Sequence, residues 1–299
     1  MQEYVMGNGA IALGALAAGV NLVAGYPGTP SSEILETISK YRHDGVYIEW
    51  SVNEKAAMEV AAAAAYSGAR AMVTMKQVGL NVAADPLMSL AYVGVKGGMV
   101  IVSADDPGPI SSQTEQDTRR FADFCRIPVF DPSSPEEAYK MIGDAFEYSE
   151  KYNTPVLFRP TTRVCHAYAS IDNCDSPSPK KYEGFVKDSK KWVIFPRLSF
   201  ANHIMIEKRN VEIGKDFSTY SANKAEGGNS EKAVVTSGIS YAYTKECLKD
   251  YPDVKLIKIA TAYPFPEDFV LSSLEGAKEV LCIDCLLYTS PSPRDLSTS

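Results

Sequence analysis

The chain has 299 residues, of which 45% are hydrophobic and 22% are charged, and its formal net charge is −7. These values are typical of an acidic globular protein with room for one large or two smaller domains. There is no tract of Lys and Arg, so we expect no nucleic-acid partner. The apolar stretch 9–24 is rich in Gly and Ala and has no charged leader. This predicts a buried helix and strand rather than a signal peptide or a membrane span, and we expect a cytoplasmic protein with no membrane partner.

Six cysteines are scattered through the chain. Cys282 and Cys285 form a C-x-x-C pair, and one such pair without a second is weak evidence for a metal site. The histidines show no metal-ligand spacing. We therefore expect reduced thiols and no bound metal in these residues.

Short apolar strands alternate with helices along the first half of the chain. Strands are predicted at 22–24, 46–49, 71–75, 98–103, 128–131 and 155–159. Helices are predicted at 9–19, 31–42, 54–66, 115–124 and 134–151, with two short helices over 78–90 broken at Pro86. This alternation predicts an α/β fold, a doubly wound parallel sheet with helices on both faces, over residues 1–165. No G-x-G-x-x-G follows the first strand, so the usual dinucleotide-binding fold is not expected.

Beyond residue 165 the composition changes twice. Residues 166–231 are rich in Ser, Pro, Lys and Asn and are interpreted as a linker or wrapping segment, with a helix at 201–211. Residues 232–285 restart the β–α pattern and predict an incomplete second α/β domain. The tail 286–299 switches abruptly to Ser, Pro and Thr. Our hypothesis is that this tail is not native but a cloning scar or an assembly artefact.

The loop after the first predicted strand is the first candidate site. Pro27, Gly28 and Pro30 cannot continue a strand or a helix, so they predict a sharp strand-to-helix connection. Ser31 or Ser32 can cap the helix that follows. A helix N-terminus beside hydroxyl groups is a ready anion site, although a turn with a cap explains the same residues.

Three further loops are expected at the same edge of the sheet, where open α/β sheets bind ligands. They are residues 51–54, 76–81 and 111–117. Asn53 is expected to cap a helix, and Glu54 places a carboxylate in its first turn, which the helix dipole favours for structural reasons alone. The sequence holds no Ser/His/Asp triad and no Gly-rich phosphate loop with a Lys.

Four stretches at these loops resemble one enzyme family. Gly25–Ile34, Glu49–Ala57, Met75–Pro86 and Ser111–Arg119 are similar, in this order, to the alpha subunits of indolepyruvate:ferredoxin oxidoreductases. These subunits belong to the thiamine-diphosphate-dependent 2-oxoacid:ferredoxin oxidoreductases. The resemblance covers residues 1–165, is weaker over 232–284, and implies that the sheet is of the pyrimidine-binding type and that the second domain resembles the C-terminal domain of transketolase.

The resemblance implies that residues 1–165 bind the aminopyrimidine half of thiamine diphosphate. Glu54 matches the family glutamate that hydrogen-bonds the pyrimidine ring, and it is the implied catalytic residue. A carboxylate there favours the imino tautomer, whose nitrogen removes the C2 proton of the thiazolium ring. The other implied cofactor-binding residues come from two loops and are Pro27, Gly28, Gln77, Val78, Gly79 and Asn81.

The resemblance also suggests how the substrate carboxylate is bound. Thr29 matches a family hydroxyl placed near that carboxylate. Related pyruvate enzymes carry an arginine after the strand that corresponds to 98–103, but this chain reads Ala-Asp-Asp-Pro-Gly from residue 104. The carboxylate must then be held by Arg163, by Arg119 or by a partner subunit, which fits an aryl substrate better than pyruvate.

The implied function is the N-terminal part of an enzyme that converts aryl pyruvates such as indolepyruvate to acyl-coenzyme A. Its implied partners are a beta subunit, ferredoxin, coenzyme A and the 2-oxoacid substrate. The Mg²⁺ and [4Fe-4S] clusters of the family are expected only in a C-terminal part that these residues lack, so we expect this chain alone to be inactive. The alternatives are a pyruvate or 2-oxoglutarate enzyme of the same family, or a non-catalytic α/β binding or assembly module.

Overall fold

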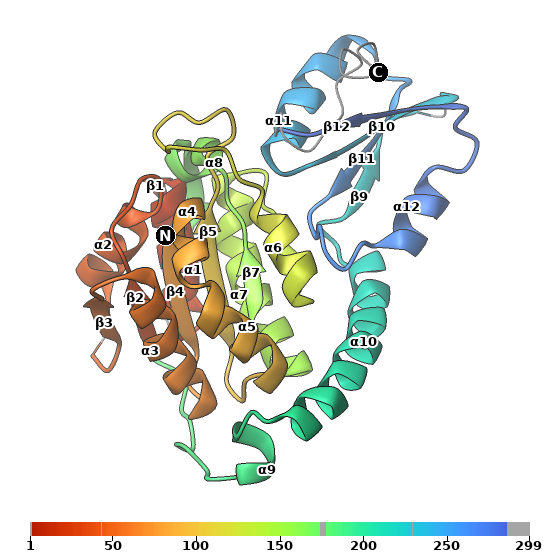
Figure 1. The fold of residues 1–299 in the computed structure, drawn as a ribbon. Helices are drawn as coiled ribbons and strands as arrows, with labels where there is room; N and C mark the ends of the chain where they lie inside the picture. The colour runs from red at the N-terminus through yellow and green to blue at the C-terminus, as the bar shows by residue number, and fades with distance from the viewer. Residues whose placement is uncertain (1, 43, 174–177, 229, 286–299) are drawn as a thin grey trace.

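The computed structural model describes residues 2–42, 44–173, 178–228 and 230–285 (Figure 1). The hypothesis about the tail 286–299 concerns residues outside these ranges. Within the described residues, no helix has the length and apolar character that crossing a membrane requires.

A six-stranded parallel sheet forms the centre of the first part of the chain. The strand order is β3-β2-β4-β5-β7-β6, and every neighbouring pair is parallel. The strands are β2 (Leu22–Gly25), β3 (Tyr47–Trp50), β4 (Ala71–Lys76), β5 (Met99–Ala104), β6 (Val129–Phe130) and β7 (Val156–Phe158). Since parallel strands need crossover connections, helices lie between them in the sequence. The predicted fold class is confirmed.

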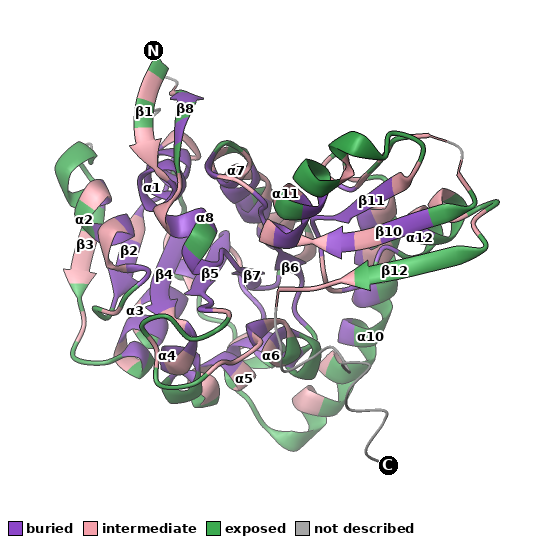
Figure 2. Ribbon diagram, turned by 90° about the horizontal axis from the view of Figure 1, so that it is seen from above, coloured by how far each residue is buried: buried purple, intermediate pink, exposed green. Residues whose placement is uncertain are grey.

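Helices cover both faces of this sheet (Figures 1 and 2). They are α1 (Gly7–Ala17), α2 (Ser32–Tyr41), α3 (Glu54–Tyr66), α4 (Gln77–Val82), α5 (Ala84–Val93), α6 (Thr118–Cys125), α7 (Pro135–Tyr152) and α8 (Thr162–His166). Side chains of one strand alternate between two buried clusters. In β5, Val100 and Val102 pack with residues of α1, α2 and α7. Met99 and Ile101 pack with residues of α3, α5 and α6. The central strand is therefore apolar on both faces, which is typical of a parallel sheet.

The break between α4 and α5 is not at Pro86, as the sequence suggested, but at Ala83. Pro86 is the third residue of α5. The first turn of a helix has no intrahelical acceptor for its N–H groups, so a proline costs little there.

A two-stranded antiparallel ribbon was not predicted. Strand β1 (Gln2–Met6) pairs with β8 (Tyr168–Asp172), in the register Gln2 to Asp172. The ring of Tyr4 stacks on that of Tyr168, with centroids 5.5 Å apart. This pairing joins the start of the chain to residues beyond 165, the boundary that the sequence suggested for the first domain.

The segment after β8 runs along the outside of the first sheet and its helices into a long helix (Figure 1). It contains α9 (Ser189–Trp192) and α10 (Pro196–Ser218), which is much longer than the predicted helix at 201–211. Helix α10 contacts α5 and α12 (Glu267–Ser273). Its buried face is apolar except for Asn210, and consists of Ile206, Asn210, Ile213 and Phe217.

A second sheet follows α10. Its strand order is β12-β10-β11-β9, with β10 parallel to both neighbours and β9 antiparallel to β11. Its elements are β9 (Lys224–Glu226), β10 (Lys232–Ser237), α11 (Gly238–Cys247), the 3₁₀ turn η1 (Leu248–Asp250), β11 (Lys255–Ile259), α12 and β12 (Glu279–Ile283). The β–α pattern that the sequence predicts over 232–285 is present. Strand β9 lies before it, within the segment 166–231 that the sequence analysis interprets as a linker.

Candidate functional site

The carboxyl ends of the six parallel strands meet at one edge of the first sheet, and the candidate residues follow those ends. The loop 26–31 follows β2, Asn53 and Glu54 follow β3, and Gln77 directly follows β4. The loop 105–117 follows β5. The parallel topology alone therefore gathers the four loops that the sequence singled out.

The first loop is closed by its own hydroxyl groups. The backbone N–H of Gly28 donates to Ser32 Oγ (2.9 Å), and Ser31 Oγ donates to the Gly28 carbonyl (3.0 Å). The expectation that Ser31 or Ser32 caps α2 is therefore wrong, since Ser31 holds the N-cap position without a side-chain bond to the helix. In a turn this tight, Gly28 offers nearer partners than the helix N–H groups do. Asn8 on α1 also fixes the loop, because its Nδ2 donates to the Pro30 carbonyl (2.7 Å).

Gly28 packs against the side chain of Lys76. A Cβ added to Gly28 would lie 3.1 Å from both Cγ and Cδ of Lys76. Lys76 Nζ lies 3.4 Å from Gln113 Oε1 in the loop 105–117. Lys76 therefore lies between the first loop and the loop 105–117. It was not among the predicted site residues.

Glu54 lies against the glycine of helix α4. It is buried, with 8% exposure, at the first position of α3, and Asn53 caps that helix by accepting from the Ala56 N–H (2.9 Å). A Cβ on Gly79 would lie 2.5 Å from Glu54 Oε1. The structure thus brings Glu54 and Gly79 together, and only a residue without a side chain leaves the carboxylate this room.

Gln77 holds the loop 105–117 by hydrogen bonds to its backbone. It is fully buried, its Nε2 donates to the Thr114 carbonyl (2.7 Å), and its Oε1 accepts from the Asp106 N–H. Both ends of the amide are therefore bound to loop backbone. Such a residue positions the loop, whatever else it contacts.

Asp106 binds the backbone of the same loop, and it was not among the predicted site residues. Its Oδ2 accepts from the N–H groups of Ile110 (3.0 Å), Ser111 (2.8 Å) and Ser112 (2.9 Å), and its Oδ1 accepts from Thr162 Oγ1 (2.7 Å). Burial alone would raise the pKa of Asp106, but these bonds favour the charged form and hold the pKa below its usual value. An ionised carboxylate therefore organises the loop.

Arg163 lines a cavity of about 340 Å³ between the first sheet's loops and the second sheet. Its neighbours there include Ile110, Thr162, Ile239 and Tyr243, and neither Thr29 nor Glu54 is among the lining residues. The side chain of Arg163 makes no hydrogen bond or ion pair to the part of the chain that the structure describes. It is therefore available to an anionic ligand.

Arg119, the other arginine considered for the substrate carboxylate, has partners within the chain. Its guanidinium binds Asp117 (2.8 Å), Asp284 (2.6 Å) and Ser237 Oγ (3.1 Å). Burial and the charge of Arg159 lower its pKa, but Asp117 and other carboxylates raise it above the usual value. Arg119 therefore joins the first part of the chain to the ends of β10 and β12, and the structure disfavours it as a substrate ligand.

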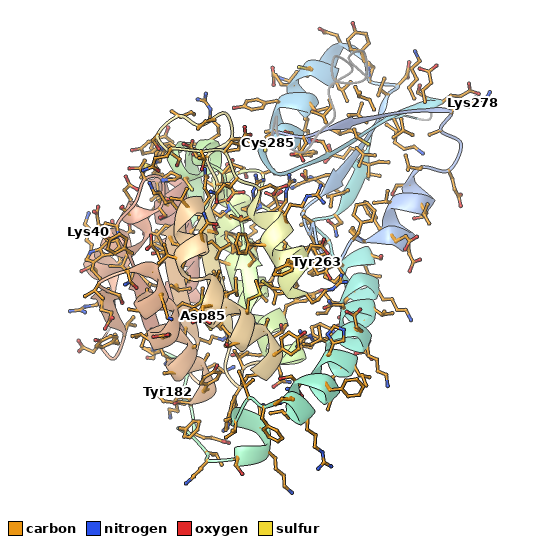
Figure 3. The ribbon with its side chains drawn as sticks, in the orientation of Figure 1. Lys40, Asp85, Tyr182, Tyr263, Lys278 and Cys285 are labelled. Atoms are coloured by element: carbon orange, nitrogen blue, oxygen red, sulfur yellow. The ribbon has the colours of Figure 1, made fainter. Side chains whose placement is uncertain are left out.

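A fully buried ion pair lies beneath this junction, and sequence reasoning missed it. Arg159 follows β7; its Nε donates to Asp105 Oδ2 (2.8 Å) and its Nη1 lies 3.3 Å from Asp131 Oδ2. All three side chains have 0% exposure. Cys285 Sγ is 3.8 Å from the same guanidinium, and it lies where the second sheet faces the first (Figure 3). Their only signal in the sequence is position: each follows a strand of the first sheet.

The remaining predicted residues are less constrained. Pro27, Thr29 and Asn81 are exposed, and Val78 is partly exposed. Pro27 and Thr29 flank Gly28, which packs against Lys76. Val78 and Asn81 lie on α4 with Gly79, which packs against Glu54. Because Lys76 directly precedes α4, its contact with Gly28 joins the first loop to that helix. Among the described residues no group of three or more His, Cys, Asp or Glu side chains could hold a metal ion.

The profile of one protein family, described as pyruvate flavodoxin/ferredoxin oxidoreductase, thiamine-diphosphate-binding, matches residues 13–223. The chain belongs to this family. The match covers every loop of the candidate site and extends through α10. It confirms the resemblance that the four motifs suggested.

The curated relatives carry more specific names than the family does. The chain is 43% identical to the indolepyruvate oxidoreductase subunit IorA of Thermococcus kodakarensis, over 94% of this chain and 45% of the relative. It is 41% identical to IorA of Methanothermobacter thermautotrophicus, over 94% of this chain and 46% of the relative. The 2-oxoglutarate synthase subunit KorA of Methanocaldococcus jannaschii is 26% identical over 93% of this chain and 87% of the relative. The chain thus spans a little under half the length of the IorA subunits.

Solved structures share the fold. A 2-oxoglutarate:ferredoxin oxidoreductase from Magnetococcus marinus, solved with 2-oxoglutarate, coenzyme A and succinyl-CoA bound, superposes with a TM-score of 0.76 at 18% identity. That match covers 94% of this chain and 57% of the other. A split-gene transketolase superposes with a TM-score of 0.57 at 13% identity, over 93% of this chain and 78% of the other. At these identities the likeness shows the fold alone.

Proposed function

We propose that this chain is the N-terminal part of an oxidoreductase that decarboxylates aryl pyruvates such as indolepyruvate. In the whole enzyme, the substrate loses carbon dioxide, the acyl group passes to coenzyme A, and two electrons pass to ferredoxin. Family membership and the IorA relatives support this proposal. The observation that carries it is the buried carboxylate of Glu54 beside Gly79, at the carboxyl edge of the sheet.

The residues present fit the pyrimidine half of thiamine diphosphate. A buried carboxyl group can hydrogen-bond a ring nitrogen, and Glu54 supplies one at the start of α3. The absent side chain of Gly79 leaves room for that carboxyl group itself. When bound, the cofactor supplies an electron sink for the carbon that loses carbon dioxide. We propose that Glu54 hydrogen-bonds the ring and stabilises the tautomer that can accept a proton.

The other residues of the edge hold this arrangement in place. Gly28 allows the first loop to pack on Lys76, and Gln77 and Asp106 fix the loop 105–117 beside it. We propose that Pro27, Val78 and Asn81 contact the cofactor from these two loops. A site held by packed and hydrogen-bonded neighbours keeps its geometry while substrate binds.

Arg163 is the proposed ligand of the substrate carboxylate, with Thr29 as a second contact from the first loop. Arg163 has no partner in the described part of the chain and lines a cavity with the side chains of Ile110, Ile239 and Tyr243. A guanidinium beside apolar side chains suits an aryl 2-oxoacid.

The test is a viologen-reduction assay with the intact subunit that contains this sequence, assembled with its proposed beta subunit. We expect indolepyruvate to be the best substrate, ahead of pyruvate and 2-oxoglutarate, and we expect the 299-residue chain alone to be inactive. A faster reaction with pyruvate or 2-oxoglutarate would overturn the substrate assignment. Viologen reduction by the 299-residue chain alone would refute the view that it is only part of the active unit.

A further inference from the structure

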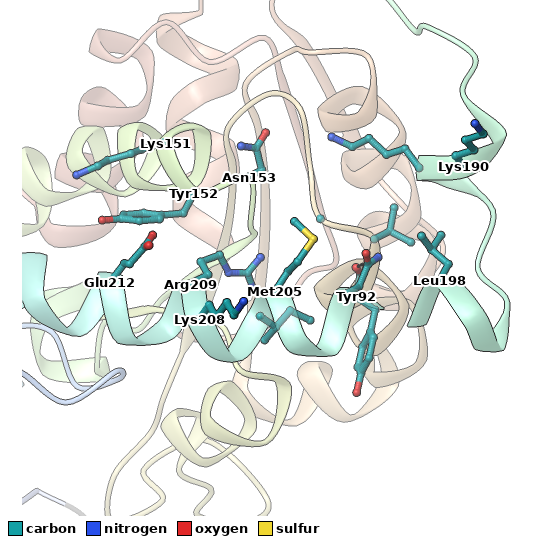
Figure 4. A pocket seen from close by; sticks show the side chains of 15 residues that line it. Tyr92, Lys151, Tyr152, Asn153, Lys190, Leu198, Met205, Lys208, Arg209 and Glu212 are labelled. Carbon is teal, nitrogen blue, oxygen red and sulfur yellow. Dashed lines mark hydrogen bonds between the residues drawn. The ribbon is translucent and has the colours of Figure 1, made fainter. Parts of the chain in front are cut away.

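A cavity of about 660 Å³ lies at the opposite edge of the first sheet from Glu54. It is lined by the C-terminal ends of α5 and α7, at Gly94 and Asn153, and by one side of α10 (Figure 4). Both ends directly precede a strand of the parallel sheet, β5 or β7, so the cavity lies at the edge where strands begin. The candidate active site lies where the strands end.

The charge of this cavity is opposite to that of the chain. Its lining includes five cationic side chains and one carboxylate, on a chain of net charge −7. The carboxylate is Glu212, which forms no ion pair with any described lysine or arginine of the lining. The cations are Lys151, Lys190, Lys191, Lys208 and Arg209. Each helix C-terminus adds only about half a negative charge, so the cavity stays positive.

Arg209 is the cation of this lining whose buried donors lack partners in the described part of the chain. Its Nε and Nη2 are inaccessible to solvent and have no hydrogen-bond partner among the described residues. Burial lowers its pKa to about 10, which leaves it charged at neutral pH. Lys151, by contrast, is paired with Asp216. Arg209 as a whole is only partly buried and lines the cavity, so a turn of its guanidinium would expose these unpartnered donors to a ligand there. Donors left without a partner are costly, and a ligand would satisfy them.

Apolar and aromatic side chains complete the lining. Tyr92, Leu198, Met205 and Tyr152 line the same space as Arg209 (Figure 4). Asn202 fixes one wall, because its Nδ2 donates to the Tyr92 carbonyl (2.8 Å). A volume of this size suits a small organic molecule. The lining therefore combines a forked donor for an anion with a surface for an apolar body.

We infer that this cavity is a second ligand site, remote from the catalytic edge, for a small organic anion whose carboxylate or phosphate group binds Arg209. Turned toward the cavity, the planar guanidinium would present parallel N–H donors that match either group. The apolar wall holds the body of the ligand. Because α10 forms one side, a bound ligand joins α10 to the first sheet and stabilises their packing.

The test is calorimetric titration of the 299-residue chain with three probes: indole-3-acetate, inorganic phosphate and indole. We expect saturable binding of an anion, and a loss of about 10- to 100-fold in affinity in Arg209→Gln. Arg197→Gln is the matched control, since Arg197 is exposed on the same helix, and it should bind as the parent does. Binding of phosphate alone would identify the ligand group as phosphate, and binding of indole-3-acetate would identify it as carboxylate.

A second variant keeps the inference testable if Arg209→Gln binds poorly for lack of folding. Arg209→Met removes the charge and keeps the apolar stem, so we expect a higher midpoint of thermal unfolding without ligand and no further rise with the anion. The inference is overturned if neither anion binds, if indole binds as tightly as indole-3-acetate, or if Arg209→Gln leaves the affinity unchanged. A lower midpoint for Arg209→Met would overturn it too, since it would show that the chain itself satisfies the guanidinium.

Discussion

Replacing Gly79 with alanine tests the packing beneath Glu54. The new Cβ would lie 2.5 Å from Oε1, 2.7 Å from Cγ and 2.9 Å from Cδ of Glu54. Since carbon and oxygen atoms in contact are about 3.5 Å apart, the carboxylate must move by roughly 1 Å. A displacement of about 1 Å at a catalytic group costs about 100-fold in rate. We expect C2-proton exchange of thiamine diphosphate in the assembled enzyme to slow by about that factor.

The same substitution should change stability little. Overpacking costs about 1–3 kcal/mol, and alanine gains about 1 kcal/mol over glycine in a helix, so we expect a net loss of at most about 2 kcal/mol. Gly143→Ala in α7 is the matched control, because its Cβ would meet only Ala18 Cβ, at 4.0 Å. It should leave exchange unchanged and raise the free energy of unfolding slightly. Unchanged exchange in a folded Gly79→Ala enzyme would refute the proposal that the position of the Glu54 carboxylate controls the exchange.

Two further predictions concern the supports of the site. The folded chain holds the pKa of Asp106 below its unfolded value of about 4, so the stabilisation that this carboxylate gives to the loop 105–117 is complete above about pH 4 and is lost as the pH falls through the folded value. The hydrogen-exchange protection factors of Ile110, Ser111 and Ser112 should therefore fall as the chain is acidified below about pH 4. Protection factors that stay constant until the whole chain unfolds would contradict this. Arg159→Met leaves Asp105 buried without its cation and leaves Asp131 only the more distant Arg119, at 3.8 Å. Denaturant unfolding should show a loss of about 3–5 kcal/mol, against at most about 1 kcal/mol for Lys55→Met in the exposed pair with Asp85. Equal losses would contradict the burial of the cluster.

The sheet was predictable because its strands are locally apolar and separated by helices with clear ends. Asn53 and Gly68 flank the predicted helix 54–66. In the structure Asn53 caps the start of α3, and Gly68 follows its end with a positive φ. Strand β1 was not predictable, because Gln2–Met6 is short and its partner lies more than 160 residues away in the chain. The serine hydroxyls next to α2 could be read as caps, but the turn at Gly28 gives them closer partners.

The sequence predicted at which edge of the sheet the candidate site lies, but not which side chains contact one another there. Parallel strands place Glu54 and Gly79 at one edge, but only the structure shows how closely they pack. The ion pairs of Arg159 were hidden, since a charged residue after a strand is usually taken as exposed. Arg119 and Arg163 are each the second residue of a helix that comes after a strand of the first sheet, and only the packing of the second sheet decides which one is free.

The most direct measurement is C2-proton exchange of thiamine diphosphate in the assembled enzyme with Glu54→Gln. Glutamine keeps the size of the side chain and removes the carboxyl group, so the fold should be intact by circular dichroism. We expect the variant to lose exchange under conditions where the parent enzyme exchanges rapidly. Exchange at the parent rate in a folded Glu54→Gln enzyme would contradict the role of this carboxyl group.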